Sequence, residues 1–102
     1  MQLIQILLPL YDKQGKAFAK TRYGAIRDEL IARFGGMTSY ARAPASGMWK
    51  EDDGSAVRDD IVIFEVMAEA LDSSWWRQYR ASLEVQFQQD VIVIRAHEIT
   101  TL

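Results

Sequence analysis

The chain has 102 residues, a length at which one domain buries roughly two-thirds of its unfolded surface and needs no disulfide or metal. Twelve Lys and Arg against fourteen Asp and Glu give a net charge of −2, which argues against nucleic acid or an anionic membrane as the main partner. The absence of cysteine excludes disulfides, thiolate nucleophiles and cysteine-based zinc sites. We therefore expect a single domain over residues 1–102, compatible with the reducing cytoplasm.

The first strand is expected from Leu3 to Leu10. This apolar stretch has no basic flank and no small-residue cleavage site, so we interpret it as a strand rather than a signal peptide. A period of two gives one uniformly apolar set of side chains, which comprises Ile4, Ile6, Leu8 and Leu10. No apolar run approaches the ~18 residues of a membrane span, so we expect no membrane insertion.

A long amphipathic helix is expected from about Lys16 to Phe34. Apolar residues recur in it at three- and four-residue spacing, at Ala19, Tyr23, Ile26, Leu30 and Phe34. Asp12 is a candidate cap for the first turn. Gly35 and Gly36 end the helix, because glycine adopts the left-handed conformation at a helix C-terminus without steric cost.

The following segment predicts a second strand over residues 37–43 and a turn over residues 44–47. Residues 48–50 are expected to continue this strand after a bulge. The acidic stretch 51–54 ends in Asp-Gly, which is typical of a hairpin turn because it tolerates positive φ. Residues 58–60 then lead into the next strand.

The strongest strand pattern in the chain lies at residues 61–68, which read IVIFEVMA. The run is β-branched and apolar, and it is too short for a buried helix. Both of its faces are apolar except for Glu65. We therefore expect it to be a central strand of a sheet that is covered on both sides.

A second helix is expected to begin near residue 72, because Asp72, Ser73 and Ser74 offer N-terminal caps. Its core stripe follows helical spacing and comprises Trp76, Tyr79, Leu83 and Phe87. Trp75 lies off this stripe, and we expect it at a dimer rim or against a loop. The Trp75–Trp76 pair could also form an aromatic cage, but packing is the simpler interpretation.

A last strand is expected over Val91–His97, with a tail over residues 98–102. The element order is then βαββαβ. Right-handed crossovers place both helices on one face of an antiparallel sheet. The sequence therefore predicts a ferredoxin-like α+β sandwich with the strand order 4-1-3-2.

Period-two alternation divides the expected sheet into two faces. The helix-side set is wholly apolar and consists of Ile4, Ile6, Leu8, Val62, Phe64, Val66, Ile92 and Ile94. Seven of the eleven residues on the open face are also apolar; the full set is Leu3, Gln5, Leu7, Ile61, Ile63, Glu65, Met67, Val91, Val93, Arg95 and His97. A monomer would expose an unusually large apolar patch. We therefore expect a second copy to cover this face in a two-fold homodimer.

A short βαββαβ chain with an apolar open face resembles the dimeric α+β barrel superfamily. That superfamily includes small cofactor-free monooxygenases and muconolactone-isomerase-like proteins. Three stretches of the chain further resemble a small bacterial protein family of this fold, namely GGMTSY at 35–40, GMW at 47–49 and RDDIVIFEV at 58–66. The resemblance implies the fold and a homodimer, and it implies no catalytic residues and no cofactor.

Four polar side chains share the expected open face: Gln5, Glu65, Arg95 and His97. A carboxylate, a guanidinium and an imidazole in one cavity could transfer protons or bind an anionic or carbonyl ligand. Glu65, Arg95 and His97 are therefore the candidate catalytic residues. The alternative is structural: Glu65 and Arg95 form a buried ion pair at the interface, and His97 lies at its rim.

A second candidate group consists of Tyr40, Arg42 and Trp49, with Arg58 near them. Aromatic rings beside a guanidinium could hold a planar or anionic ligand. Alternatively, Trp49 covers a sheet edge and Arg42 pairs with the acidic turn. The acidic residues 52, 53, 59 and 60 do not match an EF-hand loop, so we expect no metal site.

Two functions remain open at this stage. One is a protein that binds a small organic or anionic ligand, with or without catalysis, in a cavity beside the sheet through Gln5, Tyr40, Arg42, Trp49, Arg95 and His97. The other is a non-catalytic interaction module whose open face is only a dimer interface. A roomy cavity distinguishes them. RNA binding is disfavoured, because the central strands present no aromatic residues on the open face.

Overall fold

The structure is a computed structural model that describes residues 1–41, 47–50, 56–59 and 61–102. These described residues form six strands and two helices: β1 (Gln2–Pro9), α1 (Lys20–Phe34), β2 (Thr38–Ala41), β3 (Gly47–Lys50), β4 (Ala56–Asp59), β5 (Ile61–Ala68), α2 (Ser73–Gln86) and β6 (Ile94–Glu98). Strands β2, β5, β1 and β6 form one sheet in that spatial order, and β3 pairs with β4 in a separate two-stranded sheet.

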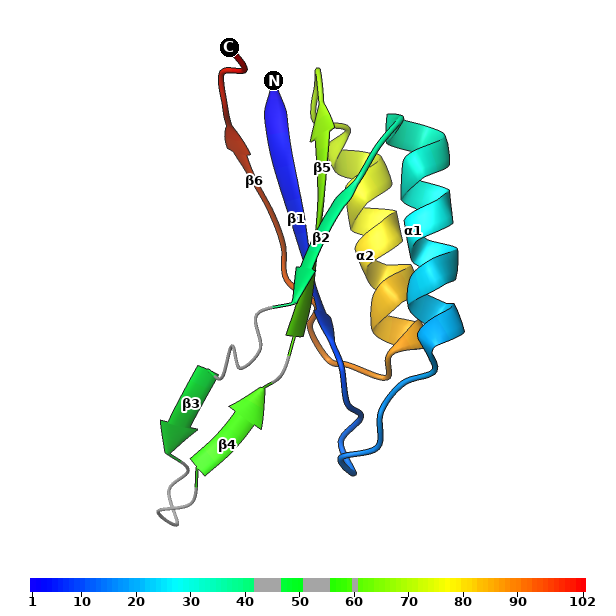
Figure 1. The fold of residues 1–102 in the computed structure, drawn as a ribbon, viewed down its shortest axis with the longest axis vertical. Coiled ribbons are helices and arrows are strands. Elements are labelled where there is room, and N and C mark those ends of the chain that lie inside the picture. Colours follow the sequence, from blue (N-terminus) through cyan, green and yellow to red (C-terminus); the bar gives the residue numbers. More distant parts are fainter. Residues whose placement is uncertain (42–46, 51–55, 60) are drawn as a thin grey trace.

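The main sheet is antiparallel throughout, and both helices cover the same face of it (Figure 1). Its order matches the expected 4-1-3-2 when β3 and β4 are set aside. The ferredoxin-like α+β arrangement is thereby confirmed. The opposite face of the sheet has no helix over it in Figure 1, and we refer to it below as the open face.

The hydrophobic core lies between the helices and the sheet. Five of the six expected helix-side residues of β1 and β5 are almost completely buried, and Val62 is partly buried. Both helices also contribute buried residues to this core. The core cluster comprises Ile4, Ile6, Leu8, Ile26, Leu30, Phe64, Val66, Trp76, Tyr79, Leu83, Phe87 and Ile92. Burial of this apolar area supplies the main driving force for folding.

The central strand β5 has the predicted bounds, Ile61–Ala68. The segment before it differs from the prediction in two respects. Residues 47–50 do not extend β2 but pair with residues 56–59, and residues 58 and 59 are therefore strand rather than a lead-in. The predicted turn at 51–54 lies outside the described residues, as does the end of the predicted strand at 42–43.

Helix α1 begins at Lys20, four residues later than expected. Asp12 does not cap it: one Asp12 carboxylate oxygen accepts hydrogen bonds from the backbone N–H groups of Gln14 and Lys16. The Asp12 N–H also donates to the Lys16 carbonyl, and Tyr11 forms a bridge with Ala17. Residues 11–17 therefore form a compact turn, because the Asp12 side chain offers the backbone an alternative to helix.

The end of α1 follows the prediction. Gly35 has φ of 82°, and its N–H donates to the Ile31 carbonyl over 2.8 Å. This left-handed conformation is costly for residues with a Cβ atom. The chain leaves the helix here and enters β2 at Thr38.

Helix α2 is capped as expected, because Asp72 accepts a hydrogen bond from the Trp75 N–H over 3.1 Å. Trp75 lies against α1 rather than at a rim or a loop. Its ring stacks on Tyr79 at 4.8 Å, meets the Phe34 ring edge-on and lies 4.1 Å from the Arg33 guanidinium. Within the described part of the chain, neither helix is long and apolar enough to cross a bilayer.

Strand β6 begins at Ile94, three residues later than predicted. The N–H of Ile92 donates to the Glu84 carboxylate of α2 over 2.9 Å, so it does not extend the ladder with β1. A single backbone bond, from the Leu7 N–H to the Val93 carbonyl, continues the contact. The segment before Ile94 is therefore a loop that the Glu84 side chain attaches to α2. Ile92 in this loop is nevertheless buried in the core.

Candidate ligand-binding site on the open sheet face

Strand register brings three of the predicted polar residues into one row across the open face. Gln5 of β1 lies directly opposite Glu65 of β5 on one side and Arg95 of β6 on the other. Directly opposed residues in an antiparallel sheet have side chains on the same face, with Cβ atoms about 5 Å apart. These side chains are therefore immediate neighbours.

A hydrogen-bonded chain runs along this row. Gln5 Nε2 donates to Glu65 Oε1 over 2.7 Å and lies 3.0 Å from the Tyr40 hydroxyl. The Tyr40 hydroxyl donates to the same Glu65 oxygen over 2.9 Å. On the other side, Arg95 Nε donates to Gln5 Oε1 over 2.8 Å. We refer to Tyr40, Glu65, Gln5 and Arg95 as the polar row.

Gln5 separates the two charged residues of the polar row. The structure shows no direct ion pair between Glu65 and Arg95 among the described residues. Within one chain, Glu65 and Arg95 are thus joined through Gln5 rather than directly. The orientation of the Gln5 amide is fixed by its partners, because a carboxylate only accepts hydrogen bonds and a guanidinium only donates them.

The polar row retains bonding capacity for a ligand. Glu65 Oε2 and both Nη groups of Arg95 make no hydrogen bond to the described residues, although Glu65 is half-buried. The row thus presents an acceptor and a cationic donor on the same face, held apart by one glutamine. Such a pair suits a small molecule that has both a hydroxyl or amino group and an anionic group.

Apolar side chains lie on both sides of the polar row. Leu3 pairs with Met67 in one flanking row, and Leu7 pairs with Ile63 in the other. Met67 is 51% exposed, and Val93 beyond β6 is 46% exposed. When a ligand or a second protein covers these apolar side chains, water leaves the face and the local dielectric falls. Hydrogen bonds to the polar row would then become stronger.

A groove adjoins the polar row at one end of β5. Strand β2 begins at Thr38, which lies opposite Glu65, so among the described residues the last part of β5 has no partner on that side. The groove has a volume of about 360 Å³, and its walls include Glu65, Met67, Leu3 and the backbone at Gly35. In the sequence, the Gly35–Gly36 pair marks the end of α1 and so delays the start of β2. The residue pattern did not indicate that this delay leaves a groove beside β5.

The other predicted site residues do not join the polar row. His97 shares the open face but pairs with Leu3, two residues further along the strand, and makes no hydrogen bond to the described residues. Arg42 lies outside the described residues. Trp49 belongs to β3, and its side chain, like that of Arg58, is also outside them. Of the predicted group Tyr40, Arg42 and Trp49, the structure therefore describes only the Tyr40 side chain. It lies in the polar row with Gln5, Glu65 and Arg95.

The perturbed tyrosines of the fold lie away from the open face. Burial raises the pKa of Tyr23 to about 12, against a smaller lowering by the charge of Arg22. Burial also raises the pKa of Tyr79, and the Glu29 carboxylate, which accepts a hydrogen bond from the phenol, raises it further. Both rings pack in the helix-side core, so these pKa shifts reflect packing rather than chemistry at the polar row.

Neither a protein-family model nor a curated protein matches the sequence. The fold does match a solved structure, a phage SAM lyase in complex with S-methyl-5'-thioadenosine. The two chains superpose with a TM-score of 0.63 at 16% sequence identity, over 95% of this chain and 80% of that chain. At this identity the likeness shows the shared fold alone.

Proposed function

We propose that this protein binds a small organic ligand on the open face of its sheet, at the polar row and the adjoining groove. The observation that supports this most directly is the unused bonding capacity of Glu65 and Arg95. Arg95 is exposed and Glu65 is half-buried, so a ligand can reach both groups from solvent. Here a half-buried carboxylate keeps one oxygen open beside a groove of about 360 Å³.

The chemistry of the row defines the class of ligand. Glu65 would accept hydrogen bonds from hydroxyl or amino groups, and Arg95 would bind an anionic or carbonyl group. Leu3 and Met67 would contact an apolar or aromatic portion, for which a thioether side chain is well suited. These features favour a small molecule with a polar end and a flat or apolar end.

A nucleoside is the first ligand that we would test within this class. The structurally similar phage SAM lyase was solved with S-methyl-5'-thioadenosine, which contains a ribose diol, an adenine and a thioether. A carboxylate is a common partner of ribose hydroxyls in nucleotide-binding proteins. Glu65 would bind the diol, while the adenine or the methylthio group would lie against Leu3 and Met67.

We further propose that a second copy of the chain covers the open face and completes the site. Met67, Val91 and Val93 are 51%, 70% and 46% exposed. Met67 lies on β5, and the two valines lie in the connection just before β6. Exposed apolar side chains on and beside a sheet are typical of an interface. A two-fold homodimer would place two polar rows between facing sheets and shield them from water.

The experiment uses the Gln5 side-chain amide as a reporter, because its N–H₂ group gives its own pair of resonances in a ¹⁵N–¹H spectrum. Isotope-labelled protein is titrated with S-methyl-5'-thioadenosine, adenosine, glutamate and benzoate. We expect at least one of them to shift the Gln5 resonances. Glu65→Gln should weaken that binding about tenfold, because it removes a charged acceptor.

Glu69→Gln is the matched control, since Glu69 is exposed just beyond β5 and makes no hydrogen bond to the described residues. It should bind like the wild type. The proposal fails if no compound in the panel moves the Gln5 resonances. It also fails if Glu65→Gln and Glu69→Gln bind equally well.

The alternative function, an interaction module, is favoured by the same exposed apolar residues. In that case the open face would close tightly against a second copy and leave no room for a ligand. Sedimentation analysis gives the oligomeric state, and the titration above then separates the two functions. A dimer whose Gln5 resonances respond to no ligand would support the interaction module.

A further inference from the structure

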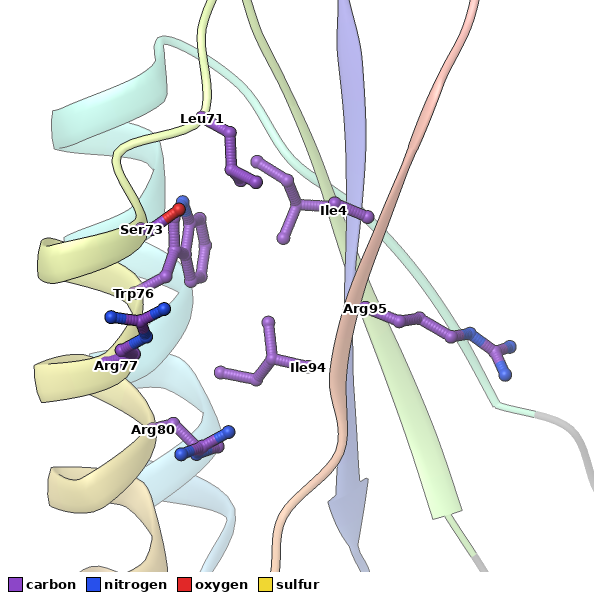
Figure 2. A pocket seen from close by; sticks show the side chains of 9 residues that line it. Ile4, Leu71, Ser73, Trp76, Arg77, Arg80, Ile94 and Arg95 are labelled. Carbon is purple, nitrogen blue, oxygen red and sulfur yellow. The ribbon is translucent and has the colours of Figure 1, made fainter.

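A second hollow lies on the other face of the sheet, between the first half of α2 and the edge strand β6 (Figure 2). Its volume is about 260 Å³. This is just below the roughly 300–1,000 Å³ of sites for drug-sized ligands, so the occupant must be small. The sheet separates this hollow from the polar row, and we refer to it as the α2–β6 cleft.

The floor of the α2–β6 cleft is apolar. Ile4 of β1 is completely buried at its base, and Trp76 of α2 is 6% exposed on its wall. Ile94 of β6 lies on the sheet side with Ile4, across from Trp76, and Leu71, which is 45% exposed, lies toward the end of the cleft. Above the buried Ile4, the accessible parts of Ile94, Leu71 and Trp76 offer a surface for a hydrocarbon or aromatic group.

Two arginines of α2 line the helix side of the α2–β6 cleft. Arg77 and Arg80 are three residues apart, a spacing that places both on one face of a helix. Figure 2 shows the guanidinium groups of both beside the cleft, whereas the Arg95 side chain extends to the opposite side of the sheet. Neither Arg77 nor Arg80 forms a hydrogen bond or ion pair with the described residues.

Three acidic residues at the ends of α2 and β6 have hydrogen-bond or ion-pair partners of their own. Asp72 binds the Trp75 N–H and lies 3.8 Å from the Arg33 guanidinium. Glu84, one turn beyond Arg80, accepts from the Ile92 N–H. On β6, Glu98 pairs with the N-terminal amine over 3.0 Å. None of these carboxylates forms an ion pair with Arg77 or Arg80 among the described residues.

We propose that the α2–β6 cleft binds a small amphiphilic carboxylate. The carboxylate would lie between Arg77 and Arg80, because guanidinium groups bind carboxylates with paired, charge-assisted hydrogen bonds. The apolar portion would lie on Ile94, Leu71 and the accessible part of Trp76. Charge complementarity thus selects an anionic head, and the small apolar floor selects a short hydrocarbon or aromatic tail. This site is independent of the one proposed on the open face.

The test measures binding of octanoate to full-length protein, with octanol as the uncharged counterpart. The indole N–H resonance of Trp76 reports the cleft in a ¹⁵N–¹H spectrum. We expect octanoate to shift this resonance and to bind at least tenfold more tightly than octanol. Added salt should weaken octanoate binding and leave octanol binding unchanged.

Three variants distinguish the cleft from general surface attraction. Arg77→Gln/Arg80→Gln should reduce octanoate affinity at least tenfold. Lys16→Gln/Lys20→Gln removes the same charge from exposed positions on the α1 side and should bind like the wild type. Ala96→Leu keeps every charge but fills the cleft from β6, and it should also weaken binding.

Two results would overturn the proposal. One is an unchanged Trp76 resonance at saturating octanoate. The other is equal binding by the two double variants, because the attraction would then depend on net charge alone. Since Arg77 and Arg80 are exposed, their replacement is not expected to unfold the protein, and the dispersion of the amide spectrum checks this directly.

Discussion

Gln5 connects Glu65 to Arg95 across three strands. Its amide nitrogen donates to Glu65 over 2.7 Å, and its amide oxygen accepts from Arg95 over 2.8 Å. A neutral side chain thereby holds two opposite charges apart on one sheet face. The charges remain available to a ligand, whereas a direct ion pair would have satisfied each with the other.

The role of Gln5 predicts a difference between two substitutions. Gln5→Leu removes the bonds to Glu65 and Arg95, and it should lower the free energy of unfolding by about 1 kcal/mol. Gln5→Glu keeps an acceptor for Arg95 but sets a second carboxylate against Glu65, so it should be the more destabilising change at neutral pH. Urea denaturation of both variants measures this order.

Added salt provides the control for that comparison. Screening should narrow the gap between Gln5→Glu and Gln5→Leu, because only the first involves repulsion between like charges. If Gln5→Glu were as stable as the wild type, Glu65 and Gln5 would not be in contact in solution.

Gly35 and Gly36 are adjacent, yet they should respond differently to substitution. Gly35 has φ of 82°, whereas Gly36 does not lie at positive φ, and a Cβ at either position would meet no atom within 4 Å. Gly35→Ala should therefore cost about 1 kcal/mol of backbone strain. Gly36→Ala should be neutral or slightly stabilising, because it only restricts the unfolded chain. Equal effects on the urea midpoint would refute the assignment of Gly35 as the C-terminal cap.

The cap of α2 can be tested with two aspartates. Asp72 accepts a hydrogen bond from the Trp75 N–H, so Asp72→Ala should destabilise the protein by about 1 kcal/mol. Asp90 is 96% exposed and makes only a 3.9 Å ion pair with Lys13. Asp90→Ala should change the stability by less than about 0.5 kcal/mol. Thermal unfolding of both variants gives the comparison, and similar losses would mean that the cap adds nothing to stability.

Residue periodicity predicted the layers of the fold correctly, because strand alternation and helical spacing are properties of the backbone itself. The bounds of β5, the burial of Ile4 and Phe64 and the strand order all follow from that periodicity. The shared face of Gln5, Glu65 and Arg95 follows from it as well, once the order of the strands is known.

Element ends were predicted less well, because they depend on single side chains that bind backbone groups. Asp12 diverts the segment before α1 into a turn, and Glu84 binds the Ile92 N–H and so shortens β6. Neither hydrogen bond can be recognised from the spacing of apolar and polar residues in the sequence. The hydrogen bonds of the polar row could not be predicted for the same reason. Strand register places Gln5 between Glu65 and Arg95, but only the side-chain geometry shows that Gln5 is hydrogen-bonded to both.

The buried phenol of Tyr23 predicts a loss of stability at alkaline pH. An ordinary tyrosine has a pKa of 10.0, whereas burial raises the pKa of Tyr23 in the folded protein to about 12. Between these values the unfolded chain binds fewer protons than the folded one, so the free energy of unfolding falls as the pH rises. Below pH 10 the phenol is protonated in both states, and its contribution is fully present.

Tyr23→Phe isolates this effect, because it keeps the ring that packs against Phe87 at 5.6 Å and removes only the hydroxyl, which donates to the Pro9 carbonyl over 2.5 Å. At neutral pH the variant should be less stable than the wild type by about 1 kcal/mol. That deficit should shrink between pH values of about 10 and about 12, because only the wild type loses stability through this group. Tyr11→Phe, which alters an exposed tyrosine, should retain the wild-type decline since Tyr23 is still present. Parallel curves for Tyr23→Phe and the wild type would show that the phenol of Tyr23 does not contribute to alkaline unfolding.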